Sequence, residues 1–381
     1  MRKTKVGAAV RPAYRLASPI VPATFFGMVL GLGGLGNGWR AAARVWDAPM
    51  FVGEALSLAA ALVWLIWMAL YVLKWVTSRE EALAEFRHPI QAFFIALVPV
   101  ATLIASIAVA PYLPAAAWTM FVLGVASQVV FIAWVVGEMW QGGRHTDATT
   151  PTLYMPTVGG CFVSSIACGA FGYPEAGLLF FGAGFLSMVV LESIVLHRLM
   201  INALPVSLRA TMGLHLATPA VGSVAYLAVT EGPPDRFVQM LFGYALLQAL
   251  VMLRLVPWLR QQPFSPAAWA YTFGVSALPL AALRFVERGQ VGPIAFLAIP
   301  LFIGANLVIG WIALRTLRLA LSGRLLPGPE QDPVTYPQMA LFNLANAVTA
   351  SSWVVDQGDE LAFAIGYDHR RRRGSYPRAQ H

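Results

Sequence analysis

Apolar residues run along this chain in long blocks separated by short polar stretches. A helix needs about 20 mostly apolar residues to cross a bilayer, and none of the blocks alternates like a membrane β-strand. Backbone polar groups in lipid must bond within their own segment, so each block is expected to be helical. The sequence predicts an all-α integral membrane protein with ten transmembrane helices, at residues 19–38, 50–75, 89–110, 113–139, 151–170, 174–199, 205–229, 236–257, 266–285 and 293–320.

The ten spans alternate in composition, which indicates five helical hairpins. Odd-numbered spans each hold two prolines and more Gly, Ser and Thr, whereas even-numbered spans are richer in Leu, Val, Ile and Trp. An interior proline removes a helix hydrogen bond and kinks the helix, which membranes tolerate where neighbours satisfy the freed carbonyl. We therefore expect the odd spans to form an inner ring and the even spans to face lipid.

Composition and charge agree with a membrane protein. Of 381 residues, 58% are hydrophobic and 12% are charged, whereas about a quarter of an ordinary soluble domain is charged. The net charge of +8 lies largely in residues 2–15 and 370–373. Basic residues beside membrane spans set topology or contact anionic lipid, so no nucleic-acid partner is expected.

The basic residues also predict orientation and domain limits. Most lie on the side of the spans that carries both termini, so both termini are expected in the cytoplasm and the protein in the cytoplasmic (inner) membrane. We divide the chain into a basic N-terminal tail (1–18), a transmembrane domain (19–320) and a cytoplasmic C-terminal tail (321–381). Within the last, residues 339–367 are predicted to form a short helix.

Motifs for enzyme chemistry are weak. The pattern G-x-G-x-x-G spans residues 31–36, but it lies inside a membrane span rather than after a strand, so it indicates close helix packing. The histidines show no metal-ligand spacing, and no nucleophile elbow is present. Cys161 and Cys168 share one apolar run and cannot approach closely enough for a disulfide. We expect no enzyme activity, no metal and no cofactor.

Ionisable residues inside membrane spans are the usual functional candidates. Glu192 is expected to pair locally with His197 or Arg198, six or fewer positions away. His215 lies on an odd span and is either a proton-sensing or substrate-contacting group or a neutral, satisfied histidine. The odd spans otherwise carry almost no charge, whereas a proton-coupled carrier usually has central carboxylates. A pore without fixed counter-charge still passes anions through weak helix dipoles.

Three motifs resemble the tellurite-resistance/dicarboxylate transporter family, which includes plant slow anion channels. They are residues 22–28 (PATFFGM), 154–159 (YMPTVG) and 269–273 (WAYTF). The resemblance implies five quasi-symmetric hairpins around a central pore and a homotrimer. It also implies passage of small anions, with Phe273 as the phenylalanine that blocks the pore. The family often has proline after this phenylalanine, where this chain has Gly274.

The sequence thus predicts a passive channel for small inorganic or organic anions, gated by Phe273. Phe26, Pro99, Pro156 and Pro219 are expected to line the pore or to kink its helices. The alternative is a proton-coupled secondary transporter that exports C4-dicarboxylate, sulfite or tellurite-type oxyanions. That mechanism needs a titrating group, for which His215 and Glu192 are the candidates.

Overall fold

The computed structural model describes residues 21–144 and 146–326. The predicted N-terminal tail, residues 327–381 of the predicted C-terminal tail and the helix predicted over 339–367 lie outside this range. The described residues are mostly helical and form no β-strand. Among them, nine helical segments are long and apolar enough to cross a membrane. The all-α membrane fold predicted from the apolar blocks is confirmed.

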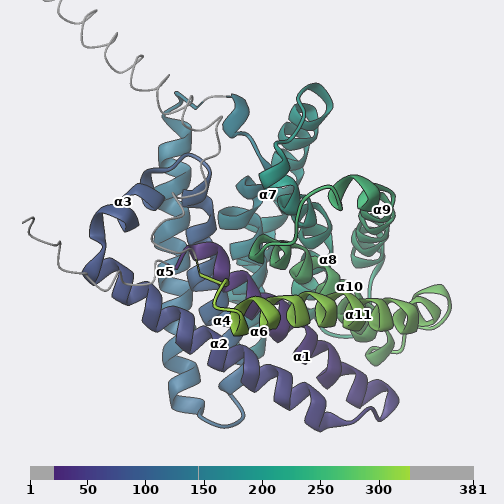
Figure 1. Cartoon of the computed structure of the whole chain (residues 1–381). Helices are drawn as coiled ribbons and strands as arrows, with labels where there is room; N and C mark the ends of the chain where they lie inside the picture. Colours follow the sequence, from purple (N-terminus) through teal and green to yellow (C-terminus); the bar gives the residue numbers. More distant parts are fainter. Residues whose placement is uncertain (1–20, 145, 327–381) are drawn as a thin grey trace, which may run out of the picture. The chain divides into compact units, whose positions relative to one another are not determined.

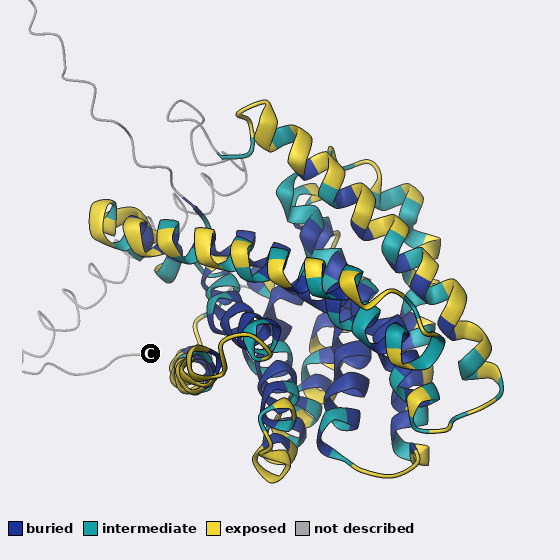
Figure 2. Ribbon diagram, turned by 90° about the horizontal axis from the view of Figure 1, so that it is seen from below, coloured by how far each residue is buried: buried dark blue, intermediate teal, exposed yellow. Residues whose placement is uncertain are grey.

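Five long helices lie on the outside of the bundle. In the most apolar part of each, only 22–28% of the residues are buried, and Figure 2 shows exposed residues along their outward faces. Leu, Val and Trp side chains remain exposed there because lipid solvates them as well as protein does. These outer helices are α2 (Met50–Thr77), α5 (Pro114–Trp140), α7 (Pro174–Ile201), α9 (Arg236–Leu259) and α11 (Pro293–Leu321).

Five other helices lie inside, and each begins with a tight turn. Four of them are 67–83% buried in their most apolar part. Each starts with a 3-10 turn, and the third continues through a π-helical turn before it becomes α-helical. The five are η1 (Ala23–Phe26) with α1 (Gly27–Trp46), η2 (Gln91–Ala96) with α4 (Leu97–Val109), η4 (Pro151–Leu153) and η5 (Met155–Gly159) with α6 (Gly160–Ala170), η6 (Val206–Met212) with α8 (Gly213–Val229), and η7 (Pro266–Ala268) with α10 (Trp269–Glu287).

The inner helices contact one another in a closed cycle. The order is α1, α4, α6, α8, α10 and back to α1. The 3-10 turns contact each other in the same cycle, η1, η2, η4, η6, η7 and back to η1, so all five inner helices begin at one end of the bundle. Each outer helix packs on the inner helix that precedes it and on the next one around the cycle. Figure 1 shows the last helix, α11, returning to lie near α1, which it contacts.

The inner and outer sets agree with the predicted odd and even spans, but the first span differs in its limits. It was predicted to end at residue 38, and α1 continues to Trp46. The helix accommodates Arg40 and Arg44 because both find acidic partners. Arg40 donates to the two carboxylate oxygens of Glu54 at 3.0 and 2.9 Å, and Arg44 contacts Glu287 at 2.5 Å. The segment is rich in glycine and is not among the nine apolar helices, so the count of ten spans stays a prediction.

The glycines of residues 31–36 bring α1 into close contact with its neighbours, as the sequence predicts. A Cβ atom on Gly31 would lie 2.2 Å from the hydroxyl of Thr272, and one on Gly34 would lie 2.2 Å from that of Ser276, both on α10. On Gly33 it would lie 2.4 Å from a methyl carbon of Ile104 on α4. These glycines let the backbones approach, which is how small residues hold membrane helices together.

Candidate functional site

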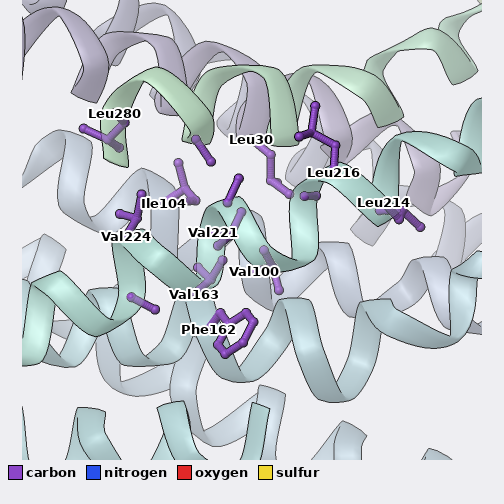
Figure 3. Close-up of a cluster of buried hydrophobic side chains, with 14 of the residues drawn as sticks. Leu30, Val100, Ile104, Phe162, Val163, Leu214, Leu216, Val221, Val224 and Leu280 are labelled. Carbon is purple, nitrogen blue, oxygen red and sulfur yellow. The ribbon is translucent and has the colours of Figure 1, made fainter. Parts of the chain in front are cut away.

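The interior of the helix cycle is filled by apolar side chains. Figure 3 shows side chains from all five inner helices that gather between them. All are buried in one continuous hydrophobic cluster, and the described parts of α4 and α6 carry no Asp, Glu, Lys or Arg. The side chains that define this interior cluster are Leu30, Val100, Ile104, Val163, Leu214, Val221, Val224 and Leu280.

Phe273 lies on the face of α10 that also carries members of this interior. It precedes Ala277 by four positions and Leu280 by seven, so the three side chains share one helix face. Ala277 and Leu280 are buried, whereas Phe273 is partly buried and packs against the hydrophobic cluster. The geometry is compatible with the predicted gate, which stays a prediction.

Gly274 allows α10 to approach α8 beside Phe273. A Cβ atom at this position would lie 2.7 Å from the backbone nitrogen of Ala217 and 3.0 Å from its Cα atom. Since backbone atoms cannot move aside as a flexible side chain does, any larger residue would push the two helices apart. The close packing of α8 and α10 therefore requires glycine at position 274.

The predicted kink prolines lie in the inner helices. Pro99 falls in the first turn of α4, just after its 3-10 start, and Pro219 falls inside α8. Pro219 has no N–H for the carbonyl of His215, and the Thr218 hydroxyl donates to that oxygen at 3.3 Å instead. Such local donors explain how an interior proline is accommodated without water.

Pro156 lies in the π-helical turn that opens α6. Its carbonyl accepts a 2.9 Å hydrogen bond from the side-chain amide of Gln128, a fully buried residue of α5. Gly160 makes room for that amide, since a Cβ there would lie 1.9 Å from the amide nitrogen. An outer helix therefore satisfies the irregular backbone of an inner one.

Phe26, the remaining predicted pore residue, packs toward an outer helix. Its side chain is fully buried, and its ring meets the Tyr71 ring of α2 edge-on, with centroids 5.7 Å apart.

Glu192 and His215 meet in one buried cluster of polar side chains. Tyr154 and Tyr244 each donate a 2.6 Å hydrogen bond to the Glu192 carboxylate, and Gln248 donates one at 3.2 Å. His215 Nδ1 lies 3.4 Å from the same carboxylate. Four elements contribute: Tyr154 precedes the π turn, Glu192 lies on α7, His215 on α8, and Tyr244 and Gln248 on α9.

The expected pairing of Glu192 with His197 or Arg198 is wrong. Arg198 donates instead to the backbone carbonyl of Asn202 at 2.9 Å, and His197 is exposed. Glu192 points away from both because its side chain reaches the donors of neighbouring helices. His215 is 2% exposed, and its Nε2 atom has no hydrogen-bond partner among the described residues. Both interpretations of His215, a proton-sensing group and a neutral histidine, therefore stay predictions.

A buried ion pair holds the start of the first inner helix. Lys74 on α2 contacts Glu85 of α3 (Arg79–Arg87) at 2.5 Å, and both side chains are almost fully buried. The other carboxylate oxygen of Glu85 accepts the Ala23 N–H at 2.8 Å, and Lys74 donates to the Val21 carbonyl at 3.4 Å. The pair is not evident in the sequence because α3 is polar and lies between two predicted spans.

Comparison with known proteins decides the family. The family model described as voltage-dependent anion channel matches residues 21–317. The chain belongs to this family. The match covers all five inner helices and nearly all of the outer ones.

Relatives of this voltage-dependent anion channel family are found in bacteria and plants. The chain is 32% identical over 298 residues to a tellurite resistance protein TehA homolog of Haemophilus influenzae, covering 78% of this chain and 90% of that protein. It is 27% identical over 285 residues to the S-type anion channel SLAH2 of Arabidopsis thaliana, and 26% identical over 306 residues to the guard cell S-type anion channel SLAC1 of the same plant. These two matches cover 70% and 75% of this chain and 53% and 54% of the plant proteins.

Membership confirms the resemblance seen in the three motifs. It identifies the chain as a multi-pass membrane protein of an anion channel and transporter family, which supports anion transport in general. The family is not one of enzymes. The cluster around Glu192 was not predicted from sequence, because its members lie 38 to 56 positions from Glu192 except for His215.

Proposed function

We propose that this chain is a passive channel for small anions, with a central pore inside the cycle of inner helices and Phe273 as its gate. Ions would move down their gradient, and selectivity would come from pore width and the cost of dehydration. Phe26, Pro99, Pro156 and Pro219 are proposed as pore-lining or kink positions.

The observation that carries the proposal is the arrangement of the five 3-10 turns. Each is the N-terminal end of an inner helix, and the five contact each other in a closed cycle at one end of the bundle. Helix N-termini carry a partial positive charge and unpaired N–H groups, which attract anions. Beyond this ring, the described interior is apolar and without acidic side chains, so it holds no fixed charge that would repel or trap an anion.

The test is current through the purified protein in planar bilayers with chloride, nitrate and malate. Phe273→Ala should raise the current sharply because the ring that narrows the path is gone. The current should reverse at the equilibrium potential of the anion.

Val275→Ala is the matched control, since Val275 lies two positions along α10 and so on nearly the opposite face. Val275→Ala should conduct like the wild type. Equal currents in the wild type and Phe273→Ala would remove Phe273 as the gate.

The buried cluster favours a second candidate function, a proton-coupled carrier for C4-dicarboxylate, sulfite or tellurite-type oxyanions. It joins a carboxylate, two tyrosines and a histidine whose Nε2 atom has no partner among the described residues, from α7, α8, α9 and the start of the third inner helix. Buried ionisable groups of this kind serve proton relays in transporters. Against this, the polar contacts of the cluster lie where two inner helices meet the outer helices α7 and α9, and none of the side chains that define the apolar interior takes part.

Uptake into vesicles separates the two candidates. A carrier would accumulate its anion under an imposed pH gradient, and His215→Ala would abolish that accumulation. A channel would show flux that follows the electrical potential, with the same pH dependence in the wild type and in His215→Gln.

Three further features of the assembly are proposed with the channel. The protein is placed in the cytoplasmic membrane as a homotrimer, with the 3-10 turns and both termini on the cytoplasmic side. The basic residues Lys74, Arg87, Arg144 and Arg209, which lie near that end, support this orientation. Chemical cross-linking in native membranes and protease protection of the tails in sealed vesicles would test the assembly and the orientation.

A further inference from the structure

A cavity of about 400 Å³ lies between the outer helices α7 and α9, outside the cycle of inner helices. Its walls are apolar and include Phe185, Val189, Phe237 and Met240. Glu192 and Tyr244 supply its main polar groups. The volume is in the range of pockets that bind small organic molecules.

The cavity faces the bilayer rather than the interior of the bundle. Val189 and Met240 are 51% and 68% exposed on the outward sides of two outer helices. Glu192 is the nineteenth residue of the 28-residue helix α7, so it lies roughly 7 Å beyond the helix midpoint at 1.5 Å per residue. A ligand would therefore enter from the hydrocarbon region of the membrane.

The carboxylate beside this cavity has one ion-pair partner among the described residues, His215, whose Nδ1 atom lies 3.4 Å away. Its donors are the neutral Tyr154, Tyr244 and Gln248, together with the longer contact to His215. No lysine or arginine within the described residues forms an ion pair with it. A largely buried carboxylate with no lysine or arginine beside it, at the edge of an apolar cavity, is complementary to a cation with an apolar body.

We propose that the cavity binds a lipid-soluble amine. The ammonium group would contact the Glu192 carboxylate, and the hydrocarbon or aromatic body would lie along Phe185, Val189 and Met240. The site is separate from the proposed pore and does not depend on the channel function.

Photolabelling of the full chain in lipid nanodiscs tests the proposal. The probes are dodecylamine, dodecanol and dodecanoate that carry the same diazirine, and the labelled peptides are mapped by mass spectrometry. The amine should label residues 185–196 and 237–244 about tenfold more than either analogue, as expected for one charge-assisted hydrogen bond. Equal labelling by the three head groups would overturn the proposal.

Variants separate the contributions of charge and shape. Glu192→Gln should reduce amine labelling about tenfold and remove the preference over the alcohol. Val189→Trp keeps the carboxylate but fills the cavity, so it should also lose labelling. Leu186→Trp, on an exposed position that does not line the cavity, is the control and should label like the wild type. Unchanged amine labelling in Val189→Trp would refute binding in the cavity.

A second copy of the chain is the alternative occupant of this face. Met240→Cys on a background without Cys161 and Cys168 tests it by oxidative cross-linking in native membranes. The proposal expects no cross-linked species through this position. Rapid cross-linking would mean that a neighbouring copy covers the cavity and would overturn the proposal.

Discussion

His88 holds the start of an inner helix through one ring nitrogen. Its Nδ1 atom accepts the N–H groups of Ile90 and Gln91 at 3.1 and 3.0 Å, just where η2 begins. Burial of the ring lowers the pKa of His88 below its ordinary value. The neutral ring is the form that caps the helix, because a proton on Nδ1 would remove the acceptor.

This cap predicts a pH-dependent stability. The pKa of His88 is lower in the folded state, so its contribution is present above the unfolded pKa of about 6.5 and is lost as the pH falls through the folded pKa. His88→Ala should cost about 1 kcal/mol at pH 7.5, measured by thermal unfolding in detergent.

His88→Asn is the matched variant, since an amide oxygen also caps helices and does not titrate. It should retain most of the stability at pH 7.5 and lose less than the wild type between pH 7 and pH 5. A steeper loss in His88→Asn than in the wild type would contradict the cap.

The buried pair of Lys74 and Glu85 gives a larger prediction. Lys74→Met leaves the Glu85 carboxylate buried without its cation, which should destabilise the fold by about 3–5 kcal/mol in thermal unfolding. Adding Glu85→Gln removes the stranded charge and keeps an acceptor for the Ala23 N–H, so the double variant should regain part of the loss. Arg79→Met, at an exposed position of α3, should change the stability by less than about 0.5 kcal/mol.

At the scale of helices, the close contact of α10 with α8 depends on glycine at position 274, which has no side chain to separate the two backbones. Gly274→Ala places a methyl group against the Ala217 backbone and should destabilise the protein by about 1–3 kcal/mol, as overpacking does. Gly243→Ala on α9 is the matched control because its Cβ would meet no atom within 4 Å. The control should be neutral or slightly stabilising in the same unfolding measurement. Equal effects of the two substitutions would contradict tight packing at Gly274.

The sequence predicts the helices well where the amino-acid composition differs between buried and lipid-exposed helices. Proline, glycine and hydroxyl residues collect in the inner helices because these tolerate kinks and close approach, and lipid-exposed helices collect Leu and Trp. The end of α1 was not predictable in this way. Arg40 and Arg44 resemble loop residues until their partners Glu54 and Glu287 are known, and Glu287 lies 243 positions from Arg44.

The candidate site is predictable only in part for the same reason. Phe273 is found from a local motif, and the structure places it on the face that carries Leu280. Glu192 and His215 are found as isolated ionisable residues, but the hydrogen bonds between Glu192 and Tyr154 or Tyr244 join separate helices. Local spacing favours the pairing with Arg198 that does not form.

At the scale of the whole transmembrane unit, the first and last hairpins contact each other through α1 and α11. Trp39 on α1 donates its indole N–H to the Asn306 side chain on α11 at 2.8 Å. Asn306→Leu should leave this partly buried N–H unpaired and destabilise the protein by about 1–3 kcal/mol in thermal unfolding. Trp39→Phe combined with Asn306→Leu removes both polar groups and should be less harmful than Asn306→Leu alone. A double variant that loses more than Asn306→Leu would argue against the hydrogen bond as the cause.

The closed cycle of helices has a consequence for biosynthesis. Gly31 and Gly34 of α1 are made early, but the α10 residues that cover them, Thr272 and Ser276, leave the ribosome only after four hairpins have been inserted. Contacts so distant along the chain form slowly, since a long loop must close first. Until then the narrow glycine face of α1 is uncovered in the membrane, so the newly made chain is most open to wrong helix partners and to quality-control proteases just before its last hairpin arrives.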